Sequence, residues 1–267
     1  MNARLLLALT VLAAAPALPQ LAPPNAAGVT IAHIHLNVSD VEAQERFFTE
    51  LGGTIVHRDK LVMAQFPGIY IILRKQDATG DSDGSSVNHF GFYVKDVAAS
   101  VAKWKADGYK WDASPNGTQG YIHGPDNIRV EIYENKSIPG SVALHHIHMF
   151  MTDPPTVQKW YADNFGAVAG KRGRWDTAVV PGTELTLGKA DMPTAPTKGR
   201  LIDHIGFEVT GLDAFVAKLK AAGIQTDGPI RGTPNAAGLR LTYVTDPAGT
   251  LIELTEGLPP HGDSASR

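Results

Sequence analysis

The feature that most constrains the fold of this chain is a short stretch that occurs four times. Its clearest copy is residues 202–209, Ile-Asp-His-Ile-Gly-Phe-Glu-Val, and the other copies cover residues 31–38, 87–94 and 144–151. Each copy has a His at its third position, and the intervals between these histidines are 56, 57 and 58 residues (33 to 89, 89 to 146, 146 to 204). A nearly fixed period of this size indicates one structural unit that has been copied.

Each copy predicts a strand that leads into a helix, and each helix is predicted to end at a Gly. These glycines follow the four histidines by 19, 19, 20 and 19 residues and are Gly52, Gly108, Gly166 and Gly223. Three further strands are expected after each helix. One such βαβββ module leaves a sheet face uncovered, so two modules should pair around a shared cavity. The sequence therefore predicts an α+β fold in which four βαβββ modules pair into two cup-shaped half-barrel sheets.

Neighbouring modules are the natural pairs, the first with the second and the third with the fourth. In this interpretation residues 29–138 form an N-terminal domain and residues 142–257 form a C-terminal domain, each with two modules. Residues 18–28 are expected to be a tether, and residues 258–267 a flexible tail.

The N-terminus has the layout of a secretory signal peptide, predicted over residues 1–17. Arg4 supplies a positive charge, residues 5–15 are almost entirely apolar, and Ala15 and Ala17 are the small residues that a signal peptidase reads. The apolar run is shorter than the ~20 residues that a membrane-spanning helix needs. We therefore expect a secreted or periplasmic protein without a membrane span.

Composition restricts the chemistry. The formal net charge is -3, and no basic run is present, so nucleic acid is not expected as a partner. The 267 residues include no Cys, which excludes disulfides, thiolate metal sites and a Cys nucleophile. Any metal must then be held by His, Asp or Glu.

Strand alternation predicts that the repeated histidines face the cavities. Side chains two residues apart share one face of a strand, so His204, Gly206 and Glu208 lie together. The intervening positions are mostly large apolar residues, which suit packing under the helices. By alignment of the modules, the cavity face also carries His33, His35 and Asn37, then His89, Gly91 and Tyr93, then His146, His148 and Phe150.

The last strands of the second and fourth modules each place a Glu among apolar neighbours. In both modules a Tyr stands four residues before a Pro and the Glu stands six residues after it, which gives Tyr121 with Glu131 and Tyr243 with Glu253. A carboxylate between apolar strand residues is costly to bury without a partner. The corresponding positions of the first and third modules are Ile72 and Thr186. Each pair of modules thus supplies two His and one Glu.

Two imidazoles and one carboxylate form a facial triad that leaves coordination positions open for a substrate. We predict a divalent metal cofactor, Fe, Mn, Zn or Ni, with both triads binding it or only one. The sequence also leaves open whether Glu184, on the same face as Thr186, is a fourth ligand. His35 and His148 are candidate substrate contacts, and Tyr243 and Tyr121 are candidate proton donors. His145 lies on the opposite face by alternation and is expected to pack or to face solvent.

Residues 29–257 resemble the vicinal oxygen chelate superfamily, which includes glyoxalase I, bleomycin- and fosfomycin-resistance proteins and the type I extradiol dioxygenases. The resemblance rests on the four His strands, the Gly-terminated helices and the segment Asp-Pro-Ala-Gly to Glu at residues 246–253. It implies paired βαβββ modules with the metal in the cup. Carried over by position, the ligands would be His146, His204 and Glu253 in one pair, and His33, His89 and Glu131 in the other.

These observations predict an exported, metal-dependent enzyme whose ion chelates neighbouring oxygens of a small-molecule substrate, with isomerase or lyase chemistry favoured. A ring-cleaving Fe(II) dioxygenase is the first alternative, although residues 234–237 lack the His that this family has before the Tyr equivalent to Tyr243. A non-catalytic binding protein like the bleomycin-resistance group is the second. A homo-oligomer is a further expectation.

Overall fold

The computed structural model describes residues 21–58, 60–233 and 238–258, and all structural statements below concern these residues. The predicted signal peptide of residues 1–17 lies outside them, as do most of the predicted tail and residues 234–237. Within the described ranges, no helix is long and apolar enough to cross a membrane.

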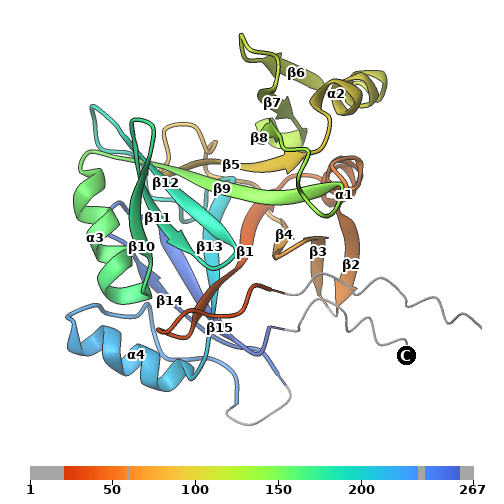
Figure 1. The fold of residues 1–267 in the computed structure, drawn as a ribbon. Coiled ribbons are helices and arrows are strands. Elements are labelled where there is room, and N and C mark those ends of the chain that lie inside the picture. Colours follow the sequence, from red (N-terminus) through yellow and green to blue (C-terminus); the bar gives the residue numbers. More distant parts are fainter. Residues whose placement is uncertain (1–20, 59, 234–237, 259–267) are drawn as a thin grey trace, which may run out of the picture.

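Four modules follow one another as predicted, each opening with a strand and a helix (Figure 1). The first module contains β1 (Val29–Val38), α1 (Val41–Glu50), β2 (Thr54–Arg58), β3 (Leu61–Phe66) and β4 (Ile69–Lys75). The second contains β5 (Val87–Val94), α2 (Val97–Ala106), β6 (Lys110–Ala113), β7 (Gln119–His123), the 3-10 turn η1 (Pro125–Asn127) and β8 (Arg129–Glu134). The third contains β9 (Val142–Met151), α3 (Pro154–Phe165), β10 (Val168–Arg172), β11 (Trp175–Val180) and β12 (Thr183–Lys189). The fourth contains β13 (Ile202–Val209), α4 (Leu212–Ala221), β14 (Arg240–Thr245) and β15 (Leu251–Glu256), so the described residues after α4 form two strands and not the expected three.

The helices begin and end where local sequence signals place them. Asp40, Asp96 and Asp153 cap α1, α2 and α3 by accepting a hydrogen bond from a backbone N–H of the first turn. All four predicted terminating glycines have a positive φ, between 65° at Gly166 and 97° at Gly52. This left-handed conformation favours Gly, which explains why the spacing from His to Gly is so regular.

The strands form two mixed sheets of seven and eight strands, and this pairing differs from the expected one. The seven-stranded sheet has the order β14-β15-β13-β1-β4-β3-β2, and the eight-stranded sheet has the order β10-β11-β12-β9-β5-β8-β7-β6. The first module therefore shares a sheet with the fourth, and the second with the third. The prediction that sequential modules share a sheet was wrong. Each sheet combines one module from each of the two domains expected over residues 29–138 and 142–257.

Sequential modules instead pack through their apolar faces. Phe48 on α1 stacks on Phe90 of β5 with ring centroids 6.5 Å apart, and Phe66 of β3 lies 4.5 Å from Phe92 of β5. Likewise Phe165 at the end of α3 lies 5.1 Å from Phe207 of β13. Figure 1 shows the same grouping, with α1 and α2 near one end of the molecule and α3 and α4 near the other. The sheets thus have an apolar face toward the helices and a polar face toward the cups.

The linker between the first and second modules and the linker between the third and fourth run side by side. Ser85, before β5, forms a parallel bridge with Ala195, before β13. The backbone N–H of Thr79 donates to Gly199 O at 2.8 Å, and that of Leu201 donates to Gly80 O at 2.9 Å. These bonds join the connection of the first two modules to that of the last two.

Residues at the end of the predicted tether are attached to the fold. The Asn25 amide donates to Phe165 O at 2.9 Å and to Gly166 O at 3.1 Å. This segment therefore satisfies carbonyls at the C-terminus of α3, which a helix end otherwise leaves without partners.

Candidate metal centres

The four repeated histidines meet in two places, one in the middle of each sheet. β1 pairs with β13 in antiparallel fashion, with His35 opposite His204 and His33 opposite Gly206. β5 pairs with β9 in the same way, with His89 opposite His148 and Gly91 opposite His146. Two clusters result, which we name the β1/β13 site (His33, His204, Glu253) and the β5/β9 site (His89, Glu131, His146, His148).

All six predicted ligands fall into these clusters, but in different sets. The predicted sets joined His33 to His89 and Glu131, and His146 to His204 and Glu253. The structure instead gives Glu253 to His33 and His204, and Glu131 to His89 and His146. The sets differ because each cup lies where the first strands of two modules pair. These strands are β1 with β13 and β5 with β9. The predicted grouping into triads was therefore wrong.

The β1/β13 site is compact and buried. Oε2 of Glu253 lies 2.9 Å from Nε2 of His33 and 2.8 Å from Nε2 of His204. Glu253 reaches both rings because β15 runs parallel to β13 with Glu253 opposite Gly206. The three residues are only 1 to 5% exposed. A carboxylate and two imidazoles thus converge on one point that solvent barely reaches.

Glycine makes room for this convergence. A Cβ on Gly206 would lie 1.9 Å from Cε1 of His33, and a Cβ on Gly91 would lie 2.5 Å from Cε1 of His146. Contacts under 3 Å do not occur in real structures without displacement of a neighbour. Each glycine is therefore the gap into which the His of the paired module fits.

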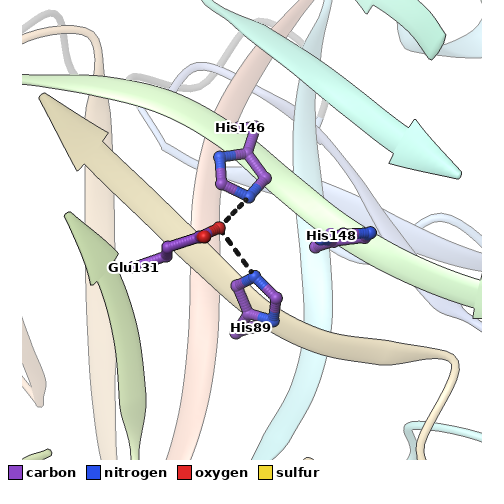
Figure 2. Close-up of side chains that lie close together, drawn as sticks. All are labelled: His89, Glu131, His146 and His148. Atoms are coloured by element: carbon purple, nitrogen blue, oxygen red, sulfur yellow. Dashed lines mark hydrogen bonds and ion pairs between the residues drawn. The ribbon is translucent and has the colours of Figure 1, made fainter. Parts of the chain in front are cut away.

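The β5/β9 site repeats this geometry more loosely. Oε2 of Glu131 lies 3.2 Å from Nε2 of His89 and 3.2 Å from Nε2 of His146 (Figure 2). The Tyr133 hydroxyl donates to the other oxygen of Glu131 at 3.1 Å. His148 lies beside the three, on the same strand as His146. One ligand atom from each of the four residues falls within 4.8 Å of all the others.

Alternation along the strands is interrupted just before each of the four histidines. The register between β1 and β13 shifts on either side of Ala32 and of Asp203, and that between β5 and β9 shifts at Asn88 and His145. Each of these residues is the extra residue of a β-bulge, a feature that re-aims side chains beside functional sites. Strict alternation places them on the far face, so sequence reasoning missed them. His145 packs against a side chain, as one of the two expectations had it, but the predicted opposite face was wrong: its Nδ1 lies 3.1 Å from Nδ1 of His146 and its ring 4.2 Å from that of Tyr93.

The bulges bring a polar partner to one ring in each site. Oδ1 of Asp203 lies 2.5 Å from Nδ1 of His204, and Oδ1 of Asn88 lies 2.8 Å from Nδ1 of His89. A partner at Nδ1 fixes the tautomer and leaves Nε2 free to bind a metal. Both sites therefore carry an outer group that orients one imidazole.

The two sites differ in charge. Burial lowers the pKa of His204, but Asp203 and Glu253 outweigh burial and raise it. Burial also opposes ionisation of Glu253, yet the neighbouring histidines hold the pKa of its carboxyl well below the usual range. In the β5/β9 site burial dominates, and the pKa of His89 is lowered. Two carboxylates at the β1/β13 site make it the more negative of the two.

The residues of both clusters fit a divalent ion. His33 Nδ1 and both ring nitrogens of His148 are buried and have no hydrogen-bond partner among the described residues. Such orphaned nitrogens are costly in a protein interior unless they bind something. Imidazole and carboxylate ligands suit Fe, Mn, Ni and Zn.

Glu184 is not drawn into the β5/β9 site as a ligand. Its Oε1 accepts hydrogen bonds from Nε of Arg172 at 2.7 Å and from the Thr186 hydroxyl at 2.7 Å. Nη2 of Arg172 in turn donates to Oγ1 of Thr186 at 2.8 Å. Arg172 and Glu184 therefore neutralise each other beside Thr186, the residue that corresponds to Ile72 in the other sheet.

A cavity of about 610 Å³ opens directly on the β1/β13 site. His204, its partner Asp203, His35 and Tyr243 form the wall nearest the cluster. The ring of His35 lies 4.4 Å and the ring of Tyr243 5.5 Å from the ring of His204. His35, a predicted substrate contact, and Tyr243, a predicted proton donor, therefore both face the cavity. The remaining wall includes Arg74, Lys198, Asp227 and Arg231.

The equivalent residues of the β5/β9 site are arranged differently. Tyr121 lies 5.2 Å from His89, ring to ring, and thus occupies the place of Tyr243. A cavity of about 670 Å³ lies nearby, and Phe150 and Trp175 belong to its wall, but none of the four site residues does. Phe150 stacks on His148 at 4.6 Å, and Trp175 lies edge-on at 5.0 Å. These two rings separate His148 from the cavity.

Comparison with known proteins agrees with the fold. Residues 143–254 match the model of the Glyoxalase/Bleomycin resistance protein/Dioxygenase superfamily. Glyoxalase I from Zea mays superposes with a TM-score of 0.67 at 17% identity, over 86% of this chain and 92% of that one. A proposed dioxygenase from Bacillus subtilis superposes with a TM-score of 0.66 at 15% identity, over 91% of this chain and 88% of that one. No curated protein sequence matches the chain.

The chain thus carries a domain of the glyoxalase/bleomycin resistance/dioxygenase superfamily, also known as the vicinal oxygen chelate superfamily, and has the fold of glyoxalase I over most of its length. The resemblance predicted from the sequence is confirmed. The superfamily includes enzymes as well as binding proteins, so membership alone does not select a reaction.

Proposed function

We propose that this protein is a metal-dependent enzyme whose reaction takes place at the β1/β13 site. One observation carries the proposal: a buried cluster of two His and one Glu lies against a cavity large enough for a small substrate. Catalytic metal sites have three protein ligands and an open position. His33, His204 and Glu253 supply three ligands, and the residue of the first module that corresponds to Glu253 is the apolar Ile72.

A divalent ion held there, Fe, Mn, Zn or Ni, would supply Lewis acidity to neighbouring oxygens of the substrate. The protein contributes the orientation of the ligands. Asp203 accepts from His204 Nδ1 and is itself held at Oδ2 by the Gly199 N–H at 2.6 Å and the Asn37 amide at 3.2 Å. His204 is therefore fixed before any substrate enters.

His35 and Tyr243 are suited to hold a substrate in the cavity by hydrogen bonds. Burial lowers the pKa of His35 to about 3, so the ring is neutral at pH 7 and can accept a hydrogen bond. Burial together with Glu253 raises the pKa of the Tyr243 hydroxyl above its usual range, so this group keeps its proton and can donate a hydrogen bond. An acceptor and a donor that line one cavity beside the three ligands favour isomerase or lyase chemistry.

The charge of the cavity wall favours an anionic substrate. Nζ of Lys198 forms an ion pair with Oδ2 of Asp227 at 3.6 Å, and the Asp203 carboxylate is hydrogen-bonded to His204. Arg74 and Arg231 form no ion pair among the described residues, and Arg231 lies over the Tyr243 ring at 5.4 Å. Guanidinium groups bind carboxylates and phosphates in a bidentate manner. We therefore expect a substrate with two neighbouring oxygens and a carboxylate or phosphate group.

A second candidate is a ring-cleaving dioxygenase. Two His and one carboxylate are the ligand set of non-haem Fe(II) oxygenases, and this observation favours the alternative. Oxygen consumption with Fe(II) and catechols separates the two reactions, because an isomerase or lyase consumes none. A metal-free protein without affinity for Mn, Fe, Ni or Zn would contradict both.

The direct test is metal titration of chelator-treated protein with Ni²⁺ or Zn²⁺. Glu253→Gln should remove the ion of the β1/β13 site and abolish turnover. Glu131→Gln, the matched change in the other sheet, should leave that ion and the turnover in place. Equal loss of turnover in both variants would refute the assignment of the reaction to one site.

Export is a further part of the proposal. Residues 1–17 support it by their layout alone, and cleavage after Ala17 would leave a mature chain that begins at Leu18. The test is the N-terminal sequence of the protein recovered from the periplasm or medium of an expressing bacterium. A full-length chain in the cytoplasm would contradict it.

A further inference from the structure

His148 is the buried side chain that the proposed reaction leaves without a role. It is 7% exposed, and neither of its ring nitrogens has a hydrogen-bond partner among the described residues. A neutral imidazole normally places a donor and an acceptor, so burial without either is unfavourable. The position therefore points to a ligand that the ring can bind.

His35 is the counterpart of His148 in the other sheet, and the comparison is informative. His35 lines the open cavity of the β1/β13 site, whereas Phe150 and Trp175 cover His148. One His is exposed to a substrate space and the other is enclosed. The same module position therefore has two different environments.

His148 is near enough to complete a set of four ligands. Its ring lies 4.8 Å from that of His89 and 5.7 Å from that of His146, centroid to centroid. Ligand atoms of these three histidines and of Glu131 fall within 4.8 Å of one another. Figure 2 shows the four side chains coming from three neighbouring strands, β5, β8 and β9.

We propose that the β5/β9 site is a closed metal site in which His89, His146, His148 and Glu131 hold one ion for stability and not for catalysis. Four protein ligands around a tetrahedral ion characterise structural zinc sites, and three ligands with an open position characterise catalytic ones. The two sheets of this chain would then divide these tasks between them.

The charge and chemistry of the site agree with this role. Three imidazoles and one carboxylate form a nitrogen-rich set, which prefers Zn, Ni or Cu to Mg, Ca or Mn. Arg172 does not add a net charge, because Glu184 accepts from it at 2.7 Å. The choice of metal at this site therefore depends on Glu131 and the three imidazole rings.

Such an ion would stabilise the fold across modules. β5 and β8 belong to the second module and β9 to the third, so the ligands join segments on both sides of residues 135–141. An ion that binds only the folded chain stabilises it by an amount that grows with the logarithm of the free ion concentration relative to the dissociation constant. The proposal therefore predicts that removal of this ion lowers the melting temperature without loss of the other metal.

Cobalt substitution tests the proposal with a spectroscopic readout, since four-coordinate Co²⁺ absorbs visible light far more strongly than five- or six-coordinate Co²⁺. In the Glu253→Gln background only the β5/β9 site remains, so the signal is independent of the proposed reaction. We expect one Co²⁺ per chain with an intense visible band. His148→Gln should lose the band and weaken binding at least ~10-fold, since even outer-shell partners contribute that much.

His35→Gln in the same background is the matched control and should keep the band. Melting temperatures with and without chelator show whether each variant folds: His148→Gln should match its parent with chelator and fall below it with metal. A weak, six-coordinate spectrum in the Glu253→Gln background, absence of binding there, or an unchanged band in His148→Gln would overturn the proposal.

Discussion

Oδ1 of Asp203 lies 2.5 Å from Nδ1 of His204, although the two residues are consecutive in one strand. Consecutive strand residues normally point to opposite faces. The bulge at Asp203, where His35 pairs with His204 but Leu36 pairs with Ile202, turns both side chains to the same face. The orientation of a central ligand thus depends on one extra residue in β13.

Replacement of Asp203 should weaken the ion of the β1/β13 site. Loss of a carboxylate that orients a metal-binding His typically costs 10–100-fold in affinity. Asp203→Ala should therefore raise the dissociation constant for Zn²⁺ by about that factor, measured by competition with a chromophoric chelator. Asp227→Ala, which removes a carboxylate from the same cavity wall but not from His204, should change it less than about 3-fold.

Gly206 should tolerate no side chain. Its added Cβ would lie 1.9 Å from His33, so Gly206→Ala must displace that ring or the strand. Overpacking of this kind costs about 1–3 kcal/mol of unfolding free energy, and the displaced ring should also cost the site its ion. Gly140→Ala is the control, because its nearest contact would be Val142 O at 3.7 Å. A Gly206→Ala protein with normal stability and metal content would contradict the geometry.

Asp246 should make stability depend on pH. Burial raises the pKa of its carboxyl to about 6, even though Tyr161 and the N–H groups of Ala248 and Thr250 donate to it. The folded state then holds the proton more tightly than the unfolded chain. This contribution is complete below pH 4 and is lost as pH rises through 6, with a magnitude of about 3 kcal/mol.

Asp246→Asn isolates this effect, since the amide keeps an oxygen for the two N–H groups and can donate to the Tyr161 hydroxyl. The difference in unfolding free energy between the variant and the original chain, from urea titrations at pH 4 to 8, should shift in favour of the variant as pH rises. A difference that does not change with pH would show that Asp246 ionises as freely in the folded protein as in the unfolded one.

The two unpaired arginines of the cavity should contribute to anion binding. Oxalate, a dianion with neighbouring oxygens, is a suitable probe of the metal-loaded protein. A hydrogen bond to a charged group contributes about 1.5–3 kcal/mol. Arg231→Ala or Arg74→Ala should therefore raise the dissociation constant for oxalate by about 10-fold or more. Arg174→Ala, at the wall of the other cavity, should leave calorimetric binding unchanged. Equal affinities in all variants would remove the argument for an anionic substrate.

Much of the fold was predictable because the modules are copies. The four histidines and the four terminating glycines located the opening strand and the helix of each module. The six metal-ligand candidates followed from period and alternation. The burial of Glu131 and Glu253 follows from their apolar neighbours in the strands, and both side chains are indeed buried.

The pairing of modules could not be deduced in the same way. Every module with a Glu carries Gly two residues after its His, at Gly91 and Gly206, and every module without one carries His35 or His148 there. The first module can therefore be paired with the second or with the fourth, and either pairing gives two His and one Glu as ligands. The choice depends on contacts between distant linkers, such as the bridge of Ser85 with Ala195.

The β-bulges could not be predicted from the sequence either. Nothing in residues 87–94 or 202–209 marks Asn88 or Asp203 as an inserted residue, because a bulge is a property of two paired strands. Alternation then assigns these side chains to the wrong face. The only hint was a polar residue directly before the His in two otherwise apolar strands.

Metal stoichiometry of two double variants tests the central claim, that each cup joins modules one and four or two and three. His33→Ala with Glu253→Gln should lose one ion and keep one, because both residues belong to the β1/β13 site. His33→Ala with Glu131→Gln should lose both ions, because the changes fall in different sites. The reverse result, two ions lost in the first variant and one kept in the second, would restore the sequential pairing and contradict this structure.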